Sequence, residues 1–444
     1  MTSDQKQPPR LGPRPLPLHL MHAAASWSGS KLALPLLKSG YAPWPLSKNG
    51  SMPSWPPNLQ ATQQGNPELE AVAREIAGVA YEDLSAAVDR ELLRRADLFA
   101  TGLEIYRQHP YCRVAVDRPV LWQEGSTKLL DFGPADAPPL LVIPSLVNRS
   151  YVLDLAPDHS LLAFLATAGV RPLLVDWGVP GTDERGFGLT DYIAGRLDRA
   201  FDITGEIADA AGWGGPGRRR QGVHVQGVHV LGYCMGGLLA LALAERKVRQ
   251  TRSLTLLATP WDFHAQQPAQ AKLLGALAAP LAQAFAAAGV LPVELLQSWF
   301  FMADPAQGLR KFSRLAALDP TSPAASHFVA IEDWLNDGVP LALPTARECL
   351  ADWYGANLPV AGRWRVAGHA VDPRRLNVPT LVVLPGHDRI VPPPSAAALA
   401  DQLPRVDRLT PSLGHVGMVV SEQAKTQVWQ PIATWLNGVD APAR

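Results

Sequence analysis

The chain has 444 residues, and its 40 lysine and arginine residues balance its 40 aspartate and glutamate residues. This length exceeds that of one ordinary domain, which favours a large catalytic domain with an extension. The zero net charge removes any general electrostatic reason to expect a nucleic acid or an anionic membrane as partner. We therefore expect a small or apolar molecule as the partner.

The three cysteines, Cys112, Cys234 and Cys349, are scattered along the chain. They cannot form a disulfide framework, and none lies in a Cys/His cluster with metal-ligand spacing. The sequence contains no uninterrupted run of about 18 apolar residues, so we expect no membrane-spanning helix. The apolar stretch Leu16–Ser26 is short and is broken by a proline and two histidines, unlike a signal peptide. We expect a cytoplasmic protein without a bound metal.

The N-terminal part of the chain changes character near Pro67. Residues 1–66 are rich in proline, serine and isolated tryptophan without helical or strand periodicity, which predicts an irregular arm. From there, apolar residues such as Leu69, Val72 and Leu103 recur at helical spacing. We predict a helical N-terminal region over residues 67–112.

From residue 113 to residue 444, short β-rich runs alternate with helical stretches, as in a mostly parallel sheet covered on both faces. We predict strands at Val114–Leu121, Lys128–Phe132, Leu140–Ile143, Pro172–Val175, Val228–Leu231, Leu254–Leu257, Thr380–Leu384 and Asp407–Leu409. A long insertion rich in alanine, leucine and tryptophan separates the sixth and seventh of these strands. We expect it to form, at about residues 262–376, a helical cap over the carboxyl edge of the sheet, where open α/β sheets bind ligands.

The segment Gly232-Tyr-Cys234-Met-Gly236 follows an apolar strand and precedes a helix of small and apolar residues. This is the nucleophile elbow G-x-[S/C]-x-G with cysteine as the nucleophile, and its tight turn requires the glycines. The helix N-terminus favours the thiolate of Cys234, and the Met235 N–H would donate into an oxyanion hole. The alternative is an inert cysteine buried at a glycine-rich turn.

Two further residues complete the expected constellation. Asp388 follows the strand Thr380–Leu384, and His415 lies on a glycine-flanked loop after the last strand. The order nucleophile, acid, base is that of the α/β-hydrolase fold. His415 would take the thiol proton, and Asp388 would orient the imidazole and stabilise its charged form. Asp262, which follows another strand, is the alternative acid.

The second oxyanion donor is expected from the loop Pro144–Asn148, which follows the third predicted strand. We predict the N–H of Val147, with that of Leu146 as the next choice. Leu146, Asn148 and Asp154 are the candidate substrate-binding residues. Asp154 suits equally well a role in capping a helix or fixing this loop.

Several segments in one order resemble the polyhydroxyalkanoate synthases, which are cysteine-dependent polymerases of 3-hydroxyacyl-CoA. The resemblance spans about residues 105–436. Its segments are Ile143–Asn148, Tyr151–Leu155, Val175–Gly178, Thr190–Ile193, Gly232–Gly237, Leu256–Phe263, Trp334–Asp337, Trp353–Asn357, Asp388–Pro392 and Gly414–Gly417.

The resemblance implies an α/β-hydrolase fold with a helical cap and a polymerising acyltransferase activity. Cys234 would be the acyl acceptor, His415 the base and Asp388 the residue that supports hydroxyl activation. No cofactor is implied, because coenzyme A enters with the substrate and leaves. The implied partners are 3-hydroxyacyl-CoA, the growing polyester, and a second copy of the chain or a second synthase subunit. The implied location is cytoplasmic, at the surface of polyester granules.

Sulfur chemistry supports the same class, because a thiolate exchanges readily with a CoA thioester to give another thioester of similar energy. A cap that excludes water would then let a hydroxyl group take the acyl group. One rival is a hydrolase, either a polyester depolymerase or a thioesterase. Dienelactone hydrolases share the elbow but have no comparable insertion. The other rival, a noncatalytic granule scaffold, is disfavoured by the intact constellation of Cys234, Asp388 and His415.

Overall fold

The computed structural model describes residues 9–38, 71, 75–213, 219–220, 223–224 and 227–440. The chain divides into two compact units. One contains residues 1–111 and 297–329, and the other contains residues 112–296 and 330–444. The insertion expected at about residues 262–376 is therefore shared between the two units and is not one separate cap.

The larger unit is built on an eight-stranded sheet with the order β1-β2-β6-β3-β9-β10-β15-β16. In chain order the strands are β1 Val120–Glu124, β2 Thr127–Asp131, β3 Pro139–Ile143, β6 Arg171–Asp176, β9 Val228–Tyr233, β10 Thr251–Leu257, β15 Thr380–Val383 and β16 Val406–Leu409. β2 pairs antiparallel with both of its neighbours, and all pairs from β6 to β16 are parallel. The mostly parallel sheet of the expected fold class is confirmed.

The first strand starts later than the sequence suggested. We predicted it over Val114–Leu121, but it begins at Val120, directly after Pro119. Val114 and Val116, which lie in the predicted strand, are exposed. Proline has no N–H to donate to a strand ladder, so it commonly marks such a boundary.

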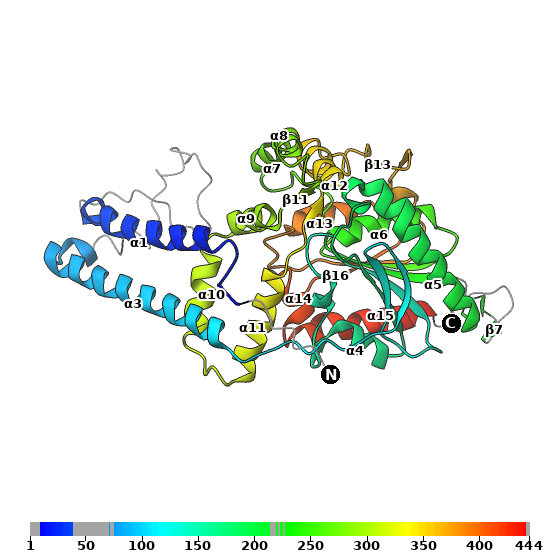
Figure 1. Ribbon diagram of the computed structural model, residues 1–444, viewed down its shortest axis with the longest axis horizontal. Helices are drawn as coiled ribbons and strands as arrows, with labels where there is room; N and C mark the ends of the chain where they lie inside the picture. The colour runs from blue at the N-terminus through cyan, green and yellow to red at the C-terminus, as the bar shows by residue number, and fades with distance from the viewer. Residues whose placement is uncertain are drawn as a thin grey trace. The chain divides into compact units, whose positions relative to one another are not determined.

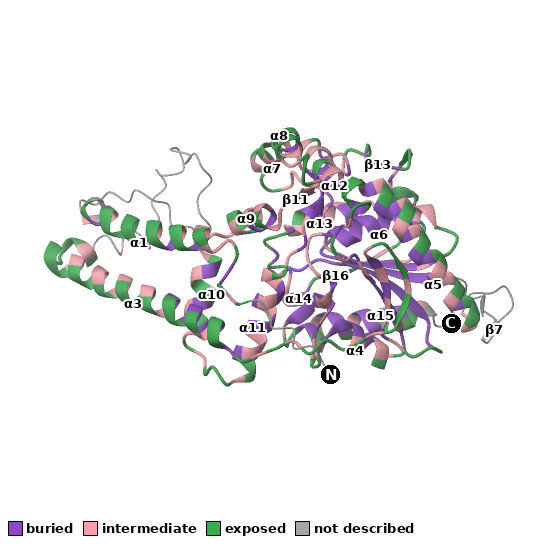
Figure 2. Ribbon diagram, viewed as in Figure 1, coloured by how far each residue is buried: buried purple, intermediate pink, exposed green. Residues whose placement is uncertain are grey.

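Helices cover both faces of the sheet. α5 and α6 lie on one side, and α4 and α15 lie on the other (Figure 1). The helices between and after the sheet strands are α4 Leu161–Thr167, α5 Asp198–Ala210, α6 Met235–Arg246, α13 Pro393–Ala400, α14 Gly417–Val420 and α15 Gln430–Asp440. β3 and β9 are buried along their whole length, as strands covered on both faces must be. Figure 2 shows the buried residues concentrated in the sheet and the sides of the helices that face it.

Between β10 and β15 the chain is mostly helical, as predicted. Its elements are α7 Pro268–Ala276, α8 Ala278–Ala284, β11 Val290–Leu291, α9 Val293–Ala303, α10 Gln307–Leu315, α11 Pro323–Asn336, β12 Leu341–Ala342, α12 Leu343–Glu348, η5 Cys349–Gly355, β13 Arg365–Val366, β14 His369–Ala370 and η6 Pro373–Arg375. The shorter elements elsewhere are η2 Ser150–Leu153, β4 Asp154–Ala156, β5 His159–Ser160, η3 Glu184–Gly186, η4 Asp191–Leu197, β7 Arg219–Arg220, β8 Val223–His224 and η7 Lys425–Trp429.

The smaller unit is helical and contains α1 Leu16–Lys38, α3 Tyr81–Gln108 and α10. Its core consists of Ala23, Phe99, Leu103, Tyr106, Phe312, Leu315, Ala325 and Val329. A Cβ atom at Gly102 would overlap the backbone carbonyl of Phe312, so this glycine lets α3 and α10 approach closely. Within the expected helical N-terminal region, α3 covers residues 81–108, and residues 71 and 75–77 are also helical. Residues 67–70 and 72–74 lie outside the described residues.

The expectation of an irregular arm over residues 1–66 is wrong for residues 16–38, which form α1. Pro17 lies in the first turn, where a missing N–H costs no intrahelical hydrogen bond. Ala23 and Leu34 are buried, although α1 carries no continuous apolar stripe that could be recognised in the sequence. Most helix stability in proteins comes from tertiary packing, which the sequence pattern did not reveal here. The remainder of the expected arm is described only from residue 9 to residue 15.

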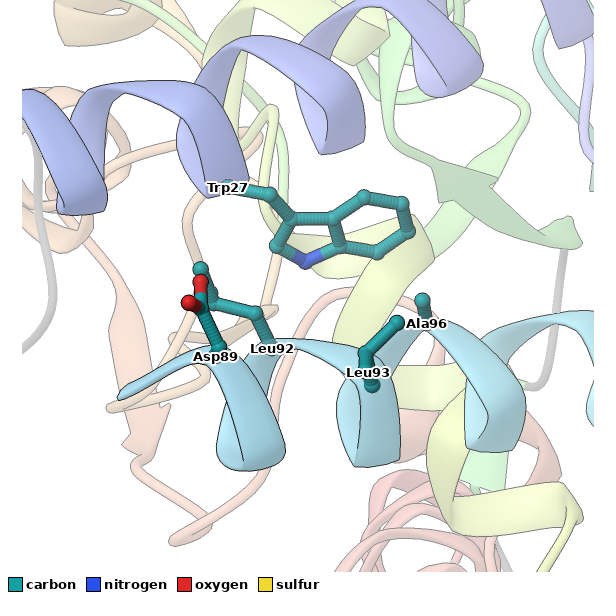
Figure 3. Close-up of a pocket in the computed structure, with 5 residues that line it drawn as sticks. All are labelled: Trp27, Asp89, Leu92, Leu93 and Ala96. Atoms are coloured by element: carbon teal, nitrogen blue, oxygen red, sulfur yellow. The ribbon is translucent and has the colours of Figure 1, made fainter. Parts of the chain in front are cut away.

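A shallow cleft of about 410 Å³ separates α1 from α3. Figure 3 shows the indole of Trp27 on α1 facing Leu92, Leu93 and Ala96 on α3. An ion pair between Lys31 and Asp89, 2.9 Å long, links the same two helices. Across the described residues, no helix is both long enough and apolar enough to cross a membrane.

Glu245 sits near the end of α6 in an environment that disfavours its charge. Its Oε2 atom accepts a hydrogen bond from the Asp372 N–H at 2.9 Å. Its Oε1 atom is buried and has no hydrogen-bond partner in the described part of the chain. Burial raises the pKa of Glu245 from 4.5 to about 7, and the hydrogen bond from Asp372 only partly opposes this.

We expect this carboxyl group to make the protein less stable as the pH rises. Because its pKa is higher in the folded than in the unfolded chain, the folded state binds more protons between pH 4.5 and about 7. The free energy of unfolding should therefore fall across that window. Glu245→Gln should gain on the order of 1 kcal/mol over the parent at pH 8 and little at pH 4.5. Urea unfolding at both pH values measures the difference.

The matched control is Glu206→Gln, which changes an exposed carboxylate on α5. It should leave the difference in stability between the two pH values unchanged. An equal effect of both variants at each pH would contradict the assignment to Glu245.

Candidate active site

Cys234 forms the turn that joins β9 to α6. Its backbone has φ 56° and ψ −126°, a strained conformation for a residue with a side chain. The Cys234 N–H donates to the carbonyl of Leu257 at 2.8 Å, and its own carbonyl accepts from the Gly237 N–H at 2.9 Å. These two hydrogen bonds hold the strained turn. The predicted sequence of strand, elbow and helix is present.

The glycines of the elbow are required by close backbone packing. A Cβ atom at Gly232 would lie 2.5 Å from the Cα atom of Gly237. A Cβ atom at Gly236 would overlap the carbonyl oxygens of Ile143 and Pro144 at the end of β3. Larger residues at these positions would therefore push α6 away from the sheet and displace Cys234.

His415 and Asp388 are joined by a short hydrogen bond. Nδ1 of His415 lies 2.7 Å from Oδ2 of Asp388. The other carboxylate oxygen of Asp388 accepts from the N–H groups of Ile390 and Val391, both at 2.8 Å. Both side chains are buried. The carboxylate is thus held by its own loop and in turn fixes the orientation of the imidazole.

The charges at the site act on the pKa of His415. Burial lowers this pKa, but the neighbouring Cys234, which hydrogen-bonds to the imidazole, and the carboxylate of Asp388 together raise it above the ordinary value. The charged imidazolium form of His415 is therefore favoured beside the sulfur of Cys234. The structure brings together the three residues that the sequence predicted as nucleophile, base and acid.

Asp262, the alternative acid, is engaged elsewhere. Its Oδ1 atom accepts from the His264 N–H at 2.9 Å and from Nδ2 of Asn357 at 2.8 Å. The side-chain oxygen of Asn357 in turn accepts from the Phe263 N–H at 3.0 Å. Asp262 therefore ties the loop after β10 to the insertion, while Asp388 accepts the hydrogen bond from His415.

The predicted oxyanion donors lie on two segments. The Met235 N–H is at the first position of α6, where helix N–H groups have no intrahelical acceptor. The Val147 N–H donates to the hydroxyl of Ser145 at 3.2 Å. The Val147 carbonyl accepts from the Val339 N–H at 3.1 Å, which ties this loop to the insertion.

The candidate substrate-binding residues have different surroundings. Leu146 is buried, and Asn148 is partly exposed and forms a β-bridge with Gly338. The carboxylate of Asp154 lies 3.6 Å from Arg118 and 4.0 Å from a guanidinium nitrogen of Arg113. These ion pairs favour the role of Asp154 in fixing the loop over direct substrate binding.

Comparison with known sequences identifies the family. Residues 138–420 match the family model of the alpha/beta hydrolase fold. The poly(3-hydroxyalkanoate) polymerase subunit PhaC of Synechocystis is 30% identical over 331 residues, which cover 71% of this chain and 83% of that protein. The chain belongs to the polyhydroxyalkanoate synthase family. The PhaC subunit of Allochromatium vinosum is 29% identical, with 78% of this chain and 92% of that protein covered.

The longer relatives extend beyond the matched region. The PhaC subunit of Haloferax mediterranei is 28% identical over 300 residues, which cover 67% of this chain but 58% of that protein. The matched region of this synthase family member contains the complete elbow and both loops that carry Asp388 and His415.

Tyr233 is a part of the site in this synthase family member that sequence reasoning missed. Its hydroxyl donates to the backbone carbonyl of His415 at 3.3 Å, and the two rings lie 5.3 Å apart between centroids. Burial raises the pKa of Tyr233, so its hydroxyl stays protonated and remains a donor. The one available signal was its position next to Cys234 in the elbow.

We expect Cys234→Ala to lower the pKa of His415. Cys234 is the strongest influence that raises this pKa, so removing its negative charge leaves burial less strongly opposed. Histidine-selective isotope labelling and an NMR titration measure the change, with the His415 signal identified by its loss in His415→Gln. Cys112→Ala removes an exposed cysteine and should leave the titration unchanged. An unaltered pKa in Cys234→Ala would show that the thiol and the imidazole are not coupled.

Proposed function

We propose that this chain is an acyltransferase that polymerises 3-hydroxyacyl groups from coenzyme A thioesters into a polyester. The observation that carries the proposal is the position of His415, which bonds to Asp388 through Nδ1 and contacts the thiol of Cys234. The curated relatives named poly(3-hydroxyalkanoate) polymerases support the choice of substrate class.

The first step loads the acyl group onto Cys234. The thiolate attacks the thioester carbonyl carbon, and the resulting oxyanion accepts hydrogen bonds from the N–H groups of Met235 and Val147. The bond between that carbon and the sulfur of coenzyme A then breaks, and the leaving thiolate takes the proton of the His415 imidazolium. The Val147 N–H becomes available once the Ser145 hydroxyl turns away from it.

The second step transfers the acyl group to a hydroxyl. His415 takes the proton of a 3-hydroxyl group, and the oxygen of that hydroxyl group attacks the acyl carbon on Cys234. The carboxylate of Asp388 stabilises the imidazolium that forms, an ester bond replaces the thioester, and the Cys234 thiolate is regenerated. Each cycle adds one ester bond and releases one coenzyme A, and it requires no resident cofactor.

The proposal also covers the location of the protein, its association with other subunits and the residues that contact the acyl group. The growing polyester remains with the enzyme, which places the protein at the surface of polyester granules. The word subunit in the names of the relatives supports association with a second copy of the chain or with a second synthase subunit. Leu146 and Asn148 would contact the acyl group from the loop that carries Val147.

The direct test is a product assay with purified protein and 3-hydroxybutyryl-CoA. Free coenzyme A, free 3-hydroxybutyrate and insoluble polyester are followed separately. We expect coenzyme A release to be matched by polyester, with free acid as a minor product. Cys234→Ala should lower coenzyme A release by at least about a thousandfold, because it removes the atom that becomes acylated. Cys112→Ala, which changes an exposed cysteine, should retain most of the activity.

Each rival function has its own signature in this assay. Coenzyme A release matched by free acid, with no polyester, would identify a hydrolase. Absence of both coenzyme A release and acyl label on Cys234 would identify a noncatalytic scaffold.

A second prediction separates the roles of the two aspartates. Asp388→Asn should slow polyester growth by about a hundredfold or more and slow acylation less, because a thiol needs less help than a hydroxyl to lose its proton. Acyl-enzyme should therefore accumulate, which intact-protein mass spectrometry detects. Asp262→Asn keeps an oxygen that can accept from His264 and Asn357, so its activity should stay within a few-fold of the parent. A larger defect in Asp262→Asn would reverse the assignment of the acid.

A further inference from the structure

Residues 144–149, which carry the predicted second oxyanion donor, form a segment that we name the oxyanion loop. It leaves the sheet beside the elbow, because Ile143 at the end of β3 pairs with Gly232 in parallel register. A Cβ atom at Gly236 would overlap the carbonyl oxygen of Pro144, so the first residue of the loop packs directly on the start of α6. The backbone of the loop is therefore in contact with the elbow.

The N–H groups of two indole rings hold the two ends of this loop. Nε1 of Trp177 donates to the carbonyl of Pro144 at 3.1 Å, and Nε1 of Trp334 donates to the carbonyl of Arg149 at 2.8 Å. Both tryptophans are buried, and both belong to the larger unit. Separating a buried N–H group from its acceptor leaves it without a partner, which costs free energy. These two contacts therefore restrict the movement of the loop.

The middle of the loop pairs with the residues that follow α11. Asn148 forms an antiparallel β-bridge with Gly338, and the Val147 carbonyl accepts from the Val339 N–H. The insertion thus binds the carbonyl of Val147, and the N–H of Val147 donates to the hydroxyl of Ser145 at 3.2 Å. A hydroxyl is a neutral acceptor, and an oxyanion in its place would form a stronger, charge-assisted hydrogen bond. The insertion therefore fixes the backbone that carries this donor and leaves the partner of the donor replaceable.

We propose that Trp177 and Trp334 are positioning residues, whose indole N–H groups fix the oxyanion loop so that the Val147 N–H meets the oxyanion formed on the acyl carbon. This inference rests on the proposed function and gives the insertion a part in stabilising the transition state. An oxyanion donor is effective when it is already in place, because a donor that has to move loses part of its interaction energy to that movement. Both tryptophans act through the loop and not on the substrate.

The test compares a reaction of Cys234 that forms an oxyanion with one that does not. Acylation by 3-hydroxybutyryl-CoA passes through an oxyanion, whereas alkylation by iodoacetamide is a direct displacement of iodide by the thiolate. Both reactions are followed in single turnovers by intact-protein mass spectrometry. The parent for this test carries Cys112→Ala, which removes the exposed cysteine.

Trp334→Phe keeps an aromatic ring and removes the N–H that holds one end of the loop. It should lower the maximal rate of acylation by at least about tenfold, which is part of the roughly hundredfold or larger loss that follows removal of a whole oxyanion donor. The substrate concentration that gives half of the maximal rate and the rate of alkylation should both stay within about twofold of the parent. Trp177→Phe releases the other end of the loop and should show the same pattern.

The matched control is Trp429→Phe. Trp429 ends η7 and is 3% exposed, as is Trp334. Its Nε1 atom is buried and has no hydrogen-bond partner among the described residues. This substitution removes a buried indole N–H without releasing the oxyanion loop, so it should change neither reaction.

The outcomes separate this inference from the function on which it rests. For each of Trp177 and Trp334, a loss of acylation with unchanged alkylation supports the positioning role. Equal losses in both reactions, an increase in the half-saturating substrate concentration alone, or no loss at all would overturn that role and leave the synthase function in place. A parent protein that is alkylated at Cys234 but is not acylated by the thioester would overturn the proposed function and the inference together.

Discussion

The strained turn at Cys234 is the constraint on which the site depends. A cysteine at φ 56° persists only because hydrogen bonds to Leu257 and from Gly237 hold it from both sides. The first of these partners ends the neighbouring strand β10, and the second lies in the helix that the turn begins. Nucleophile geometry is therefore a property of the central sheet rather than of one loop.

The other reacting groups come to this turn because their loops leave the same edge of the sheet. β3, β9, β10, β15 and β16 run parallel, so the residues that follow them gather at their carboxyl ends. Asp388 adds a local device, since two N–H groups of its own loop hold one carboxylate oxygen while the other meets His415. The imidazole is thus fixed by a buried and rigid carboxylate, and its charged form is stabilised on both sides.

Much of the sheet and of the site could be predicted because their signals are local. Apolar runs between turn residues identify strands, and the elbow motif identifies Cys234 together with its backbone geometry. The role of Asp262 could not be resolved in this way, because its hydrogen bonds to His264 and Asn357 depend on contacts with a distant segment. Ser145 is a different case, because its hydroxyl accepts from the Val147 N–H only two residues along the chain, and the loop sequence alone did not reveal this local contact. α1 was missed because its helix depends on a few packing contacts and has no periodic apolar stripe.

The noncontiguous make-up of the smaller unit limits how such a chain can be shortened. Its core takes Phe99 and Leu103 from one end of the sequence and Phe312 and Leu315 from the middle of the insertion. Removal of residues 1–111 would expose the side chains of Phe312 and Leu315 to water. Such exposed apolar side chains promote aggregation. The two segments therefore form one folding module although they are far apart in the sequence, so a shortened chain has to keep both or omit both.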